Sequence, residues 1–286
     1  MRTIDFEQIA QAVERLCVEA CHELPADVVR ALERAAERES NPRAATILRQ
    51  LIENARLADQ DQVPLCQDTG LTVVFVEQGS EVVVAPAASG GRTLVEAVNE
   101  GVRAGYEAGY LRKSIVADPL NQRKNTTTNT PAIVHLSIMP GDTLKLTVMA
   151  KGGGCENKSQ FRMFRPTAER EQVIDWVTGV VRETGADACP PFVVGVGIGG
   201  NFEHSCLLSK RALLRGLDEP NADLFYAQME RDLLERINAL GLGPQGLGGD
   251  TTALAVLIET APCHIASLPV AVNIECHSHR HKTAIL

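Results

Sequence analysis

The 286-residue chain lacks several features that would place it in a broad class at once. It has no run rich in Lys and Arg and carries a net charge of −8, so nothing suggests binding to nucleic acid. Its longest apolar runs are shorter than the roughly 18 residues that a membrane-spanning helix needs. Residues 1–5 contain no apolar segment typical of a secretory signal. We therefore expect a cytoplasmic protein with neither a membrane nor a nucleic-acid partner.

The sequence also has no Cys-x-x-Cys pair, although it contains eight cysteines. This absence argues against zinc ribbons and ferredoxin-type clusters, whose ligands are closely spaced. In a chain of this size without a signal peptide, reduced thiols that bind metal or act in catalysis are favoured over disulfides. Any metal site must therefore be assembled from distant parts of the chain. The cysteines are Cys17, Cys21, Cys66, Cys155, Cys189, Cys206, Cys263 and Cys276.

What is present is a composition that can build a large core, 44% hydrophobic and 22% charged. Apolar residues at helical spacing predict a series of helices within 4–60, and the rest of the chain mixes strand and helix patterns. We predict a mixed α/β (α+β) fold, with an N-terminal helical layer over 1–60 and then a mixed body, in one domain over 1–286. We expect strands 72–76 and 81–85 to pair through a turn at 78–80. The other expected elements are strands 132–138, 143–150, 192–194, 254–258 and 266–274, and helices 93–102, 169–183, 203–214 and 221–240.

A polar turn stands directly before the strand predicted at 72–76. Cys66, Gln67, Asp68 and Thr69 place a thiol, a carboxamide, a carboxylate and a hydroxyl side by side, and Gly70 follows. Such a turn is costly to dehydrate beside a buried strand unless something binds there. The alternative is that Cys66 is a small, inert, buried side chain, as most single cysteines are.

Three more segments place polar chemistry at the edge of an expected element. Lys151 and the glycines 152–154 follow an expected strand. Backbone N–H groups in such a segment can approach an anion closely. The alternative is a flexible hairpin tip, which has the same composition. Cys189 precedes two prolines that fix the backbone, as in a ligand site or a plain connector. Cys276 ends a strand beside His277 and Ser278, where a polar tail is the alternative.

One glycine-rich segment imitates a dinucleotide-binding motif. Residues 195–200 formally match G-x-G-x-x-G between a strand and a helix. The acidic residues about twenty positions further on, Asp218 and Glu219, follow a helix and a turn, whereas the motif requires a second strand. We therefore predict no dinucleotide site here, and leave open an anion site at the start of the helix.

Taken together and in order, these segments resemble the α subunit of the two-subunit class I fumarate hydratases and L(+)-tartrate dehydratases. The resemblance covers essentially the whole chain. The residues that carry it are Cys66 to Gly70, Lys124 to Thr126 with Asn129 and Pro131, Lys151 to Gly154 with Asn157 and Lys158, Cys189 to Pro191, residues 195–200, residues 243–249, and Asn273 to Ser278.

The resemblance implies an enzyme, a hydro-lyase that adds water to or removes it from a C4 dicarboxylate. It implies a [4Fe-4S] cluster held at strand ends by three cysteines, Cys66, Cys189 and Cys276, so that one iron stays open as a Lewis acid. It further implies Asp68 as a catalytic residue. The substrate contacts implied by the resemblance are Gln67, Asp68, Arg112, Gly152, Gly153 and Gly154.

The resemblance also implies a partner. In the family the base that removes the proton lies in a β subunit, so this chain is expected to hold the cluster, to be inactive alone and to work in an α2β2 assembly. The sequence does not separate fumarate and malate from tartrate. Position 155 is Cys where the family has Ser, and Cys206 is a second additional thiol. We expect neither to be a cluster ligand, although a fourth thiolate would close the open iron.

Two other classes of function remain open from the sequence alone. A non-catalytic iron–sulfur carrier or sensor would have a fourth thiolate ligand and no response of the cluster to substrate. A zinc-binding scaffold protein would be colourless and contain zinc.

Overall fold

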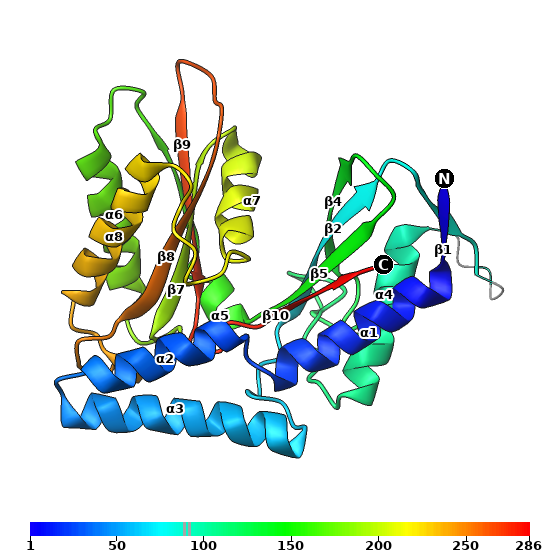
Figure 1. Cartoon of the computed structure of the whole chain (residues 1–286), viewed down its shortest axis with the longest axis horizontal. Helices are drawn as coiled ribbons and strands as arrows, with labels where there is room; N and C mark the ends of the chain where they lie inside the picture. The colour runs from blue at the N-terminus through cyan, green and yellow to red at the C-terminus, as the bar shows by residue number, and fades with distance from the viewer. Residues whose placement is uncertain (88–89, 91–92) are drawn as a thin grey trace. The chain divides into compact units, whose positions relative to one another are not determined.

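The computed structural model describes residues 1–87, 90 and 93–286. The chain forms two compact units (Figure 1). Unit 1 comprises Met1–Pro25, Ala55–Gly153 and Arg280–Leu286, and unit 2 comprises Ala26–Asn54 and Gly154–His279. Each unit is therefore assembled from segments that lie far apart in the sequence.

Unit 1 is built on a four-stranded sheet with the order β10-β5-β2-β4. Strands β2 and β4 run parallel, whereas β5 is antiparallel to both β2 and β10. Helices α1 and α4 pack against each other and bury their apolar faces with one face of this sheet in a common core. The elements are β1 (Arg2–Asp5), α1 (Phe6–His22), β2 (Leu71–Gly79), β3 (Val82–Ala85), α4 (Leu94–Ala108), β4 (Ile133–Met139), β5 (Leu144–Lys151) and β10 (His281–Ile285).

The expected pairing of strands 72–76 and 81–85 is wrong. Strand β3 pairs in parallel with β1, and β2 pairs with β4 and β5. The turn between β2 and β3 is short enough for a hairpin, but the apolar stretch 73–76 of β2 gains more from an interior position than from a sheet edge. Strand β2 is buried over most of its length and takes the interior place.

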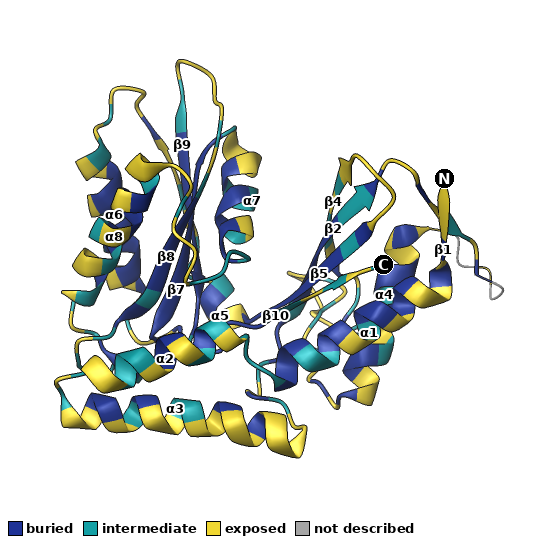
Figure 2. Cartoon of the chain, viewed as in Figure 1, coloured by how far each residue is buried: buried dark blue, intermediate teal, exposed yellow. Residues whose placement is uncertain are grey.

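Unit 2 contains the second four-stranded sheet, with the order β6-β9-β7-β8. Strand β7 is buried at every position and lies between β9 and β8. Helices α6 and α8 lie on one side of this sheet and α7 on the other (Figures 1 and 2). The elements are α2 (Ala26–Arg38), β6 (Gln160–Phe164), α6 (Arg170–Thr184), β7 (Phe192–Gly199), α7 (Phe202–Ala212), α8 (Leu224–Asn238), the 3-10 turn Pro244–Gly246, β8 (Ala253–Ala261) and β9 (Leu268–Glu275).

The glycines of β7 serve the packing of α7. A Cβ atom at Gly195 would lie 2.0 Å from the carbonyl oxygen of Ser209, and one at Gly197 would lie 2.1 Å from that of Ser205. Only glycine therefore lets the helix backbone approach the strand this closely. This contact explains the G-x-G spacing without a dinucleotide.

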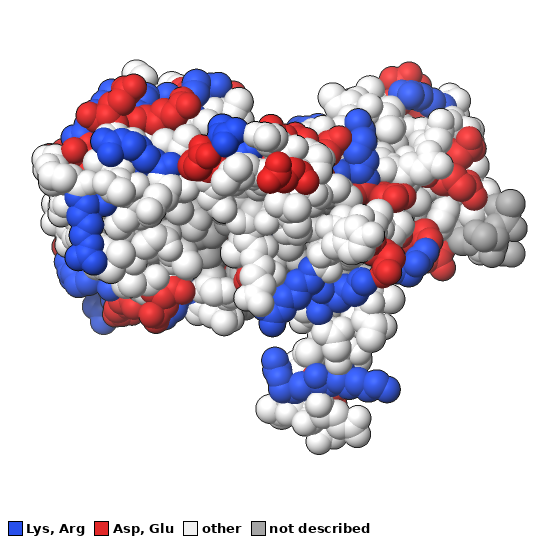
Figure 3. Space-filling model, turned by 90° about the horizontal axis from the view of Figure 1, so that it is seen from below, with Lys and Arg blue, Asp and Glu red and all other residues white. Residues whose placement is uncertain are grey.

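Two further elements lie across the boundary of the units. Helix α3 (Pro42–Asp61) starts in unit 2 and ends in unit 1, and α5 (Gly153–Glu156) starts at the last residue of unit 1. Among the described residues, no helix is both long and apolar enough to cross a membrane. On the face shown in Figure 3, Lys and Arg side chains lie among Asp and Glu side chains. The mixture of helices and sheets confirms the predicted mixed α/β class.

Candidate functional site

The polar turn of unit 1 is fixed by a backbone hydrogen bond at one end and by close backbone packing at the other. The N–H of Leu65 donates to the carbonyl of Cys21 at the end of α1, with an N···O distance of 2.9 Å. At the other end, Gly70 has a φ of +72°, and a Cβ atom there would lie 2.5 Å from the carbonyl oxygen of Lys151. Between these anchors Cys66 and Gln67 are exposed, so a thiol and a carboxamide are available to a ligand.

Asp68 is oriented by the backbone on both sides. Its Oδ1 accepts a hydrogen bond from the N–H of Gly70 and its Oδ2 accepts one from the N–H of Gly153, each at 2.9 Å. These two hydrogen bonds fix the direction of the carboxylate. An ionised carboxylate has about four acceptor positions, so these two bonds leave acceptor capacity for a ligand.

Arg280 holds the same turn from the C-terminal segment. Its Nη1 donates to the carbonyl oxygen of Asp68 at 2.7 Å, and the residue is only 2% exposed. A Cβ atom at Gly152 would lie 3.3 Å from Asp68 Oδ2 and 3.6 Å from Arg280 Nη2, so a side chain there would crowd both groups. The predicted substrate contacts Asp68, Gly152 and Gly153 are therefore together in unit 1. Gly154 is the first residue of the Gly154–His279 segment of unit 2.

The predicted Arg112 is brought to the turn by its backbone. Thr69 Oγ1 donates to the carbonyl of Arg112 at 3.0 Å, and Tyr106 donates its hydroxyl to the carbonyl of Thr69 at 2.8 Å. Asn129 Nδ2 donates to the carbonyl of Gly70 at 3.3 Å. Asn129, from the polar segment 124–131, thus contributes to the turn. The side chain of Arg112 is exposed.

Cys189 and Cys276 lie together in unit 2 because β7 and β9 are antiparallel neighbours. The pair Val193 and Glu275 joins the start of β7 to the end of β9, and each cysteine lies just outside this end of the sheet. The N–H of His277 donates to the carbonyl of Cys189 at 3.4 Å, and His277 Nδ1 lies 3.1 Å from the same oxygen. Cys189 is exposed, whereas Cys276 is buried.

The glycine-rich segment 243–249 supports this end of the sheet. Gln245 donates both its backbone N–H and its Nε2 to the carbonyl of Pro190, at 2.7 and 3.0 Å. Its Nε2 also lies 3.1 Å from His277 Nδ1. The sequence analysis did not predict Gln245 as a residue of the site. The glycine-rich composition of residues 243–249 was the feature that could have indicated it.

Cys155 is part of a compact group in unit 2. The Sγ atoms of Cys155 and Cys276 and a carboxylate oxygen of Glu275 all lie within 4.8 Å of one another, and all three residues are buried. Cys155 Sγ also contacts the carbonyl of Ala188 at 3.5 Å. This group could hold a metal ion, so the chain contains a potential metal-binding group of thiols and a carboxylate. None of the eight cysteines, all described, forms a disulfide.

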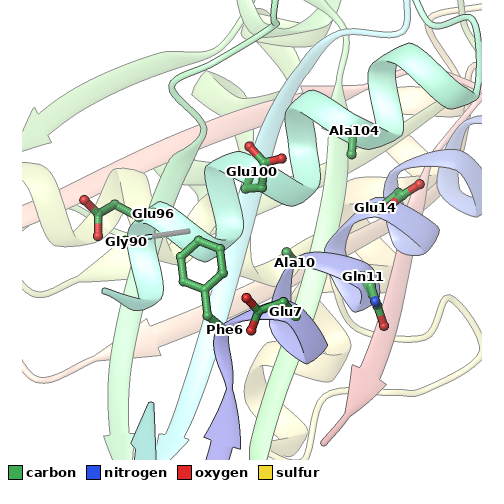
Figure 4. Close-up of a pocket in the computed structure, with 9 residues that line it drawn as sticks. All are labelled: Phe6, Glu7, Ala10, Gln11, Glu14, Gly90, Glu96, Glu100 and Ala104. Carbon is green, nitrogen blue, oxygen red and sulfur yellow. The ribbon is translucent and has the colours of Figure 1, made fainter. Parts of the chain in front are cut away.

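A separate cavity of about 540 Å³ lies in unit 1 between α1 and α4 (Figure 4). Its wall includes the carboxylates of Glu7, Glu14, Glu96 and Glu100. These charges repel an anion, and the described residues that line the cavity include no Cys, Lys or Arg. It is therefore unsuited to an anionic substrate.

Comparisons with known proteins bear on the family of this chain. Residues 10–285 match the family model described as "Fumarate hydratase (Fumerase)". The chain is 39% identical over 277 residues to a Methanocaldococcus jannaschii protein named "Putative L(+)-tartrate dehydratase subunit alpha", with 96% of this chain and 95% of that protein covered. It is 31% identical over 265 residues to the L(+)-tartrate dehydratase subunit alpha of Escherichia coli K12, with 92% and 86% covered. The chain therefore belongs to the fumarate hydratase family, as its motifs predicted.

Proposed function

We propose that this chain is the α subunit of an iron–sulfur hydro-lyase that reversibly adds water to fumarate or removes it from malate. The enzyme class rests on membership of the fumarate hydratase family over residues 10–285, and this match is the observation that carries the proposal. The names of the relatives, which end in "subunit alpha", support a partner subunit. We propose that the partner is a β subunit in an α2β2 assembly, in the cytoplasm.

The proposed cofactor is a [4Fe-4S] cluster bound by Cys66, Cys189 and Cys276. Thiolates are the ligands that iron–sulfur clusters prefer. Cys66 and Cys189 are exposed, and Cys276 Sγ lies 3.0 Å from the hydroxyl of Ser278, which can stabilise a thiolate. Cys17 and Cys21, in contrast, belong to the apolar core of unit 1. The donor chemistry of the three proposed residues therefore fits the cluster.

When bound, a cluster with three protein ligands supplies an open iron that acts as a Lewis acid toward substrate oxygens. The residues of this chain have the task of binding and orienting the dicarboxylate. Arg112 is proposed to bind one carboxylate, because a guanidinium pairs with a carboxylate through two parallel hydrogen bonds. Gly152 and Gly154 are proposed to approach the other carboxylate through their backbone, and Gln67 to donate through its carboxamide.

Asp68 is proposed to accept a hydrogen bond from the substrate. Both of its oxygens are already held by backbone N–H groups, so the carboxylate need not reorganise when the substrate binds. Gly153 gives its N–H to this carboxylate, and its proposed contribution to substrate binding therefore includes the orientation of Asp68. The group that exchanges a proton with the substrate carbon is proposed to lie in the β subunit.

Tartrate is the second candidate substrate, favoured by the names of the relatives at 31% and 39% identity. Both candidates present two carboxylates and an oxygen to the same residues. The experiment is to purify the chain anaerobically with and without its β subunit, to reconstitute iron and sulfide, and to measure hydration of fumarate and dehydration of L-tartrate. Activity only with both subunits, lost in air, supports the proposal and names the substrate. A stable cluster without turnover on either substrate would instead support a carrier or sensor.

A further inference from the structure

Three buried groups of unit 2 form a donor set that shares only Cys276 with the three cysteines proposed for the cluster. Cys155 is 3% exposed, Glu275 is fully buried, and Cys276 is 8% exposed. One ligand atom from each lies within 4.8 Å of the other two. Two thiolates and a carboxylate are a donor set that binds Zn²⁺ or a similar divalent ion in tetrahedral geometry, with one position left for water.

The position of Cys155 is fixed from two neighbouring elements. The adjacent Glu156 receives two hydrogen bonds from Lys210 Nζ, at 2.6 and 2.7 Å, and one from Asn273 Nδ2 at 3.4 Å. These contacts tie α5 to α7 and to β9, whose last residue is Glu275. The short helix that carries Cys155 is therefore held in place, which reduces the entropic cost of binding a metal.

The other two donors are fixed by local hydrogen bonds. Glu275 Oε1 accepts from the N–H of Cys276 at 3.3 Å, and Cys276 Sγ lies 3.0 Å from Ser278 Oγ. The Ser278 hydroxyl can donate to the thiolate that a metal requires. Three acidic groups buried side by side are costly to ionise together, and a divalent cation removes that cost.

We propose that Cys155, Glu275 and Cys276 form a mononuclear site for a divalent, thiol-preferring metal such as Zn²⁺ in the cluster-free chain. Cys276 belongs both to this site and to the proposed cluster. This part of the inference rests on the proposed function: a bound Zn²⁺ withholds Cys276 from the cluster and so opposes cluster assembly. Cys155 is then the residue that makes this chain sensitive to zinc.

The first experiment titrates the full cluster-free chain with Co²⁺ under anaerobic conditions and follows the thiolate-to-cobalt absorption. We expect one Co²⁺ per chain with the intensity of two thiolates. Cys155→Ser should halve that intensity, and Glu275→Gln should weaken Co²⁺ binding tenfold or more. Cys206→Ser is the matched control, because Cys206 is a half-buried thiol of the same unit outside the group, and it should leave the titration unchanged. An unchanged titration with Cys155→Ser, or one that depends on Cys66 and Cys189, overturns the site.

The second experiment reconstitutes iron and sulfide with and without one equivalent of Zn²⁺. We expect Zn²⁺ to lower the yield of cluster in the wild-type chain several-fold more than in Cys155→Ser. If both chains assemble cluster equally well with Zn²⁺, the competition is refuted and the proposed function stands. If neither chain assembles a cluster without Zn²⁺, the proposed cofactor fails, while the Co²⁺ titration still decides the mononuclear site.

Discussion

His277 is hydrogen bonded to the carbonyl oxygen of Cys189, through its backbone N–H at 3.4 Å and through Nδ1 at 3.1 Å. A carbonyl oxygen only accepts, so the backbone N–H of His277 is the donor in the first of these contacts. The contact joins the segment before β7 to the segment after β9. It keeps Cys276 next to Cys189, although these two cysteines lie far apart in the sequence.

Serine substitution of the proposed cluster ligands is expected to separate them from the other thiols. Cys66→Ser, Cys189→Ser and Cys276→Ser should each abolish assembly of the [4Fe-4S] cluster, since a serine hydroxyl is a poor ligand for iron in such a cluster. Cys155→Ser and Cys206→Ser should keep it. The visible absorption and the iron and sulfide content of anaerobically reconstituted protein measure the outcome. A full cluster in any of the first three variants removes that cysteine from the ligand set.

Asp68→Asn is expected to impair both the turn and the activity. The amide nitrogen of Asn would face the N–H of Gly70 or that of Gly153, so one of these two hydrogen bonds is lost, at a net cost of about 1 kcal/mol. Urea unfolding of the α subunit should show this loss, and kcat of the reconstituted enzyme should fall. Asp61→Asn, at an exposed position, is the control and should change neither quantity. Wild-type stability in Asp68→Asn would mean that these hydrogen bonds contribute little.

Gly70→Ala is expected to destabilise unit 1 more than Gly141→Ala does. Both glycines have positive φ, +72° and +102°, so both variants carry backbone strain of about 1–2 kcal/mol. At Gly141 a Cβ atom would meet nothing within 4 Å, whereas at Gly70 it would overlap the carbonyl of Lys151. The overlap should add about 1–3 kcal/mol to the loss of unfolding free energy. Equal losses of unfolding free energy in the two variants would show that backbone strain alone, without the overlap, accounts for the effect at Gly70.

Unit 1 is expected to lose stability at alkaline pH. Burial raises the pKa of Cys21 from 9.0 to about 11, and burial also raises the pKa of Cys17 and that of Tyr106. Between pH 9 and about 11 the unfolded chain therefore binds fewer protons at Cys21 than the folded chain does, so the free energy of unfolding falls as the pH rises. The stabilisation is fully present below pH 9, and the loss from Cys21 is on the order of 2–3 kcal/mol.

The measurement is urea unfolding of the cluster-free chain at a series of pH values from 7 to 11. Cys21→Ala removes one of the buried acids, so its stability should decline less steeply above pH 9 than that of the wild type. Cys263→Ala removes an exposed thiol and should follow the wild-type slope. Identical slopes in all three chains would exclude Cys21 as a source of the alkaline loss.

The sequence alone determined the features that depend on local chemistry. Helical periodicity predicted the helices of residues 6–61, and strand patterns predicted β2, β5, β7 and β9, because these segments alternate or concentrate apolar residues over their own length. The motifs around Cys66, Cys189 and Cys276 predicted the family for the same reason. A ligand motif is a short run of side chains, and its identity does not depend on how the chain folds.

Only the tertiary structure decided which of these segments meet. Strand β2 pairs with β4 and β5, and β3 pairs with β1, because burial of both edges of an apolar strand outweighs a short turn. Strands β1, β6 and β10 were not predicted, since each mixes polar and apolar residues over only four or five positions, whereas the equally short β3 is entirely apolar. From the sequence, Arg280 could belong to a polar C-terminal tail. In the structure its guanidinium is buried and donates to the carbonyl of Asp68. A buried charge needs a hydrogen-bond partner, and for Arg280 this partner is the carbonyl of Asp68. Asp68 lies far from Arg280 in the sequence, so residue spacing could not predict the contact.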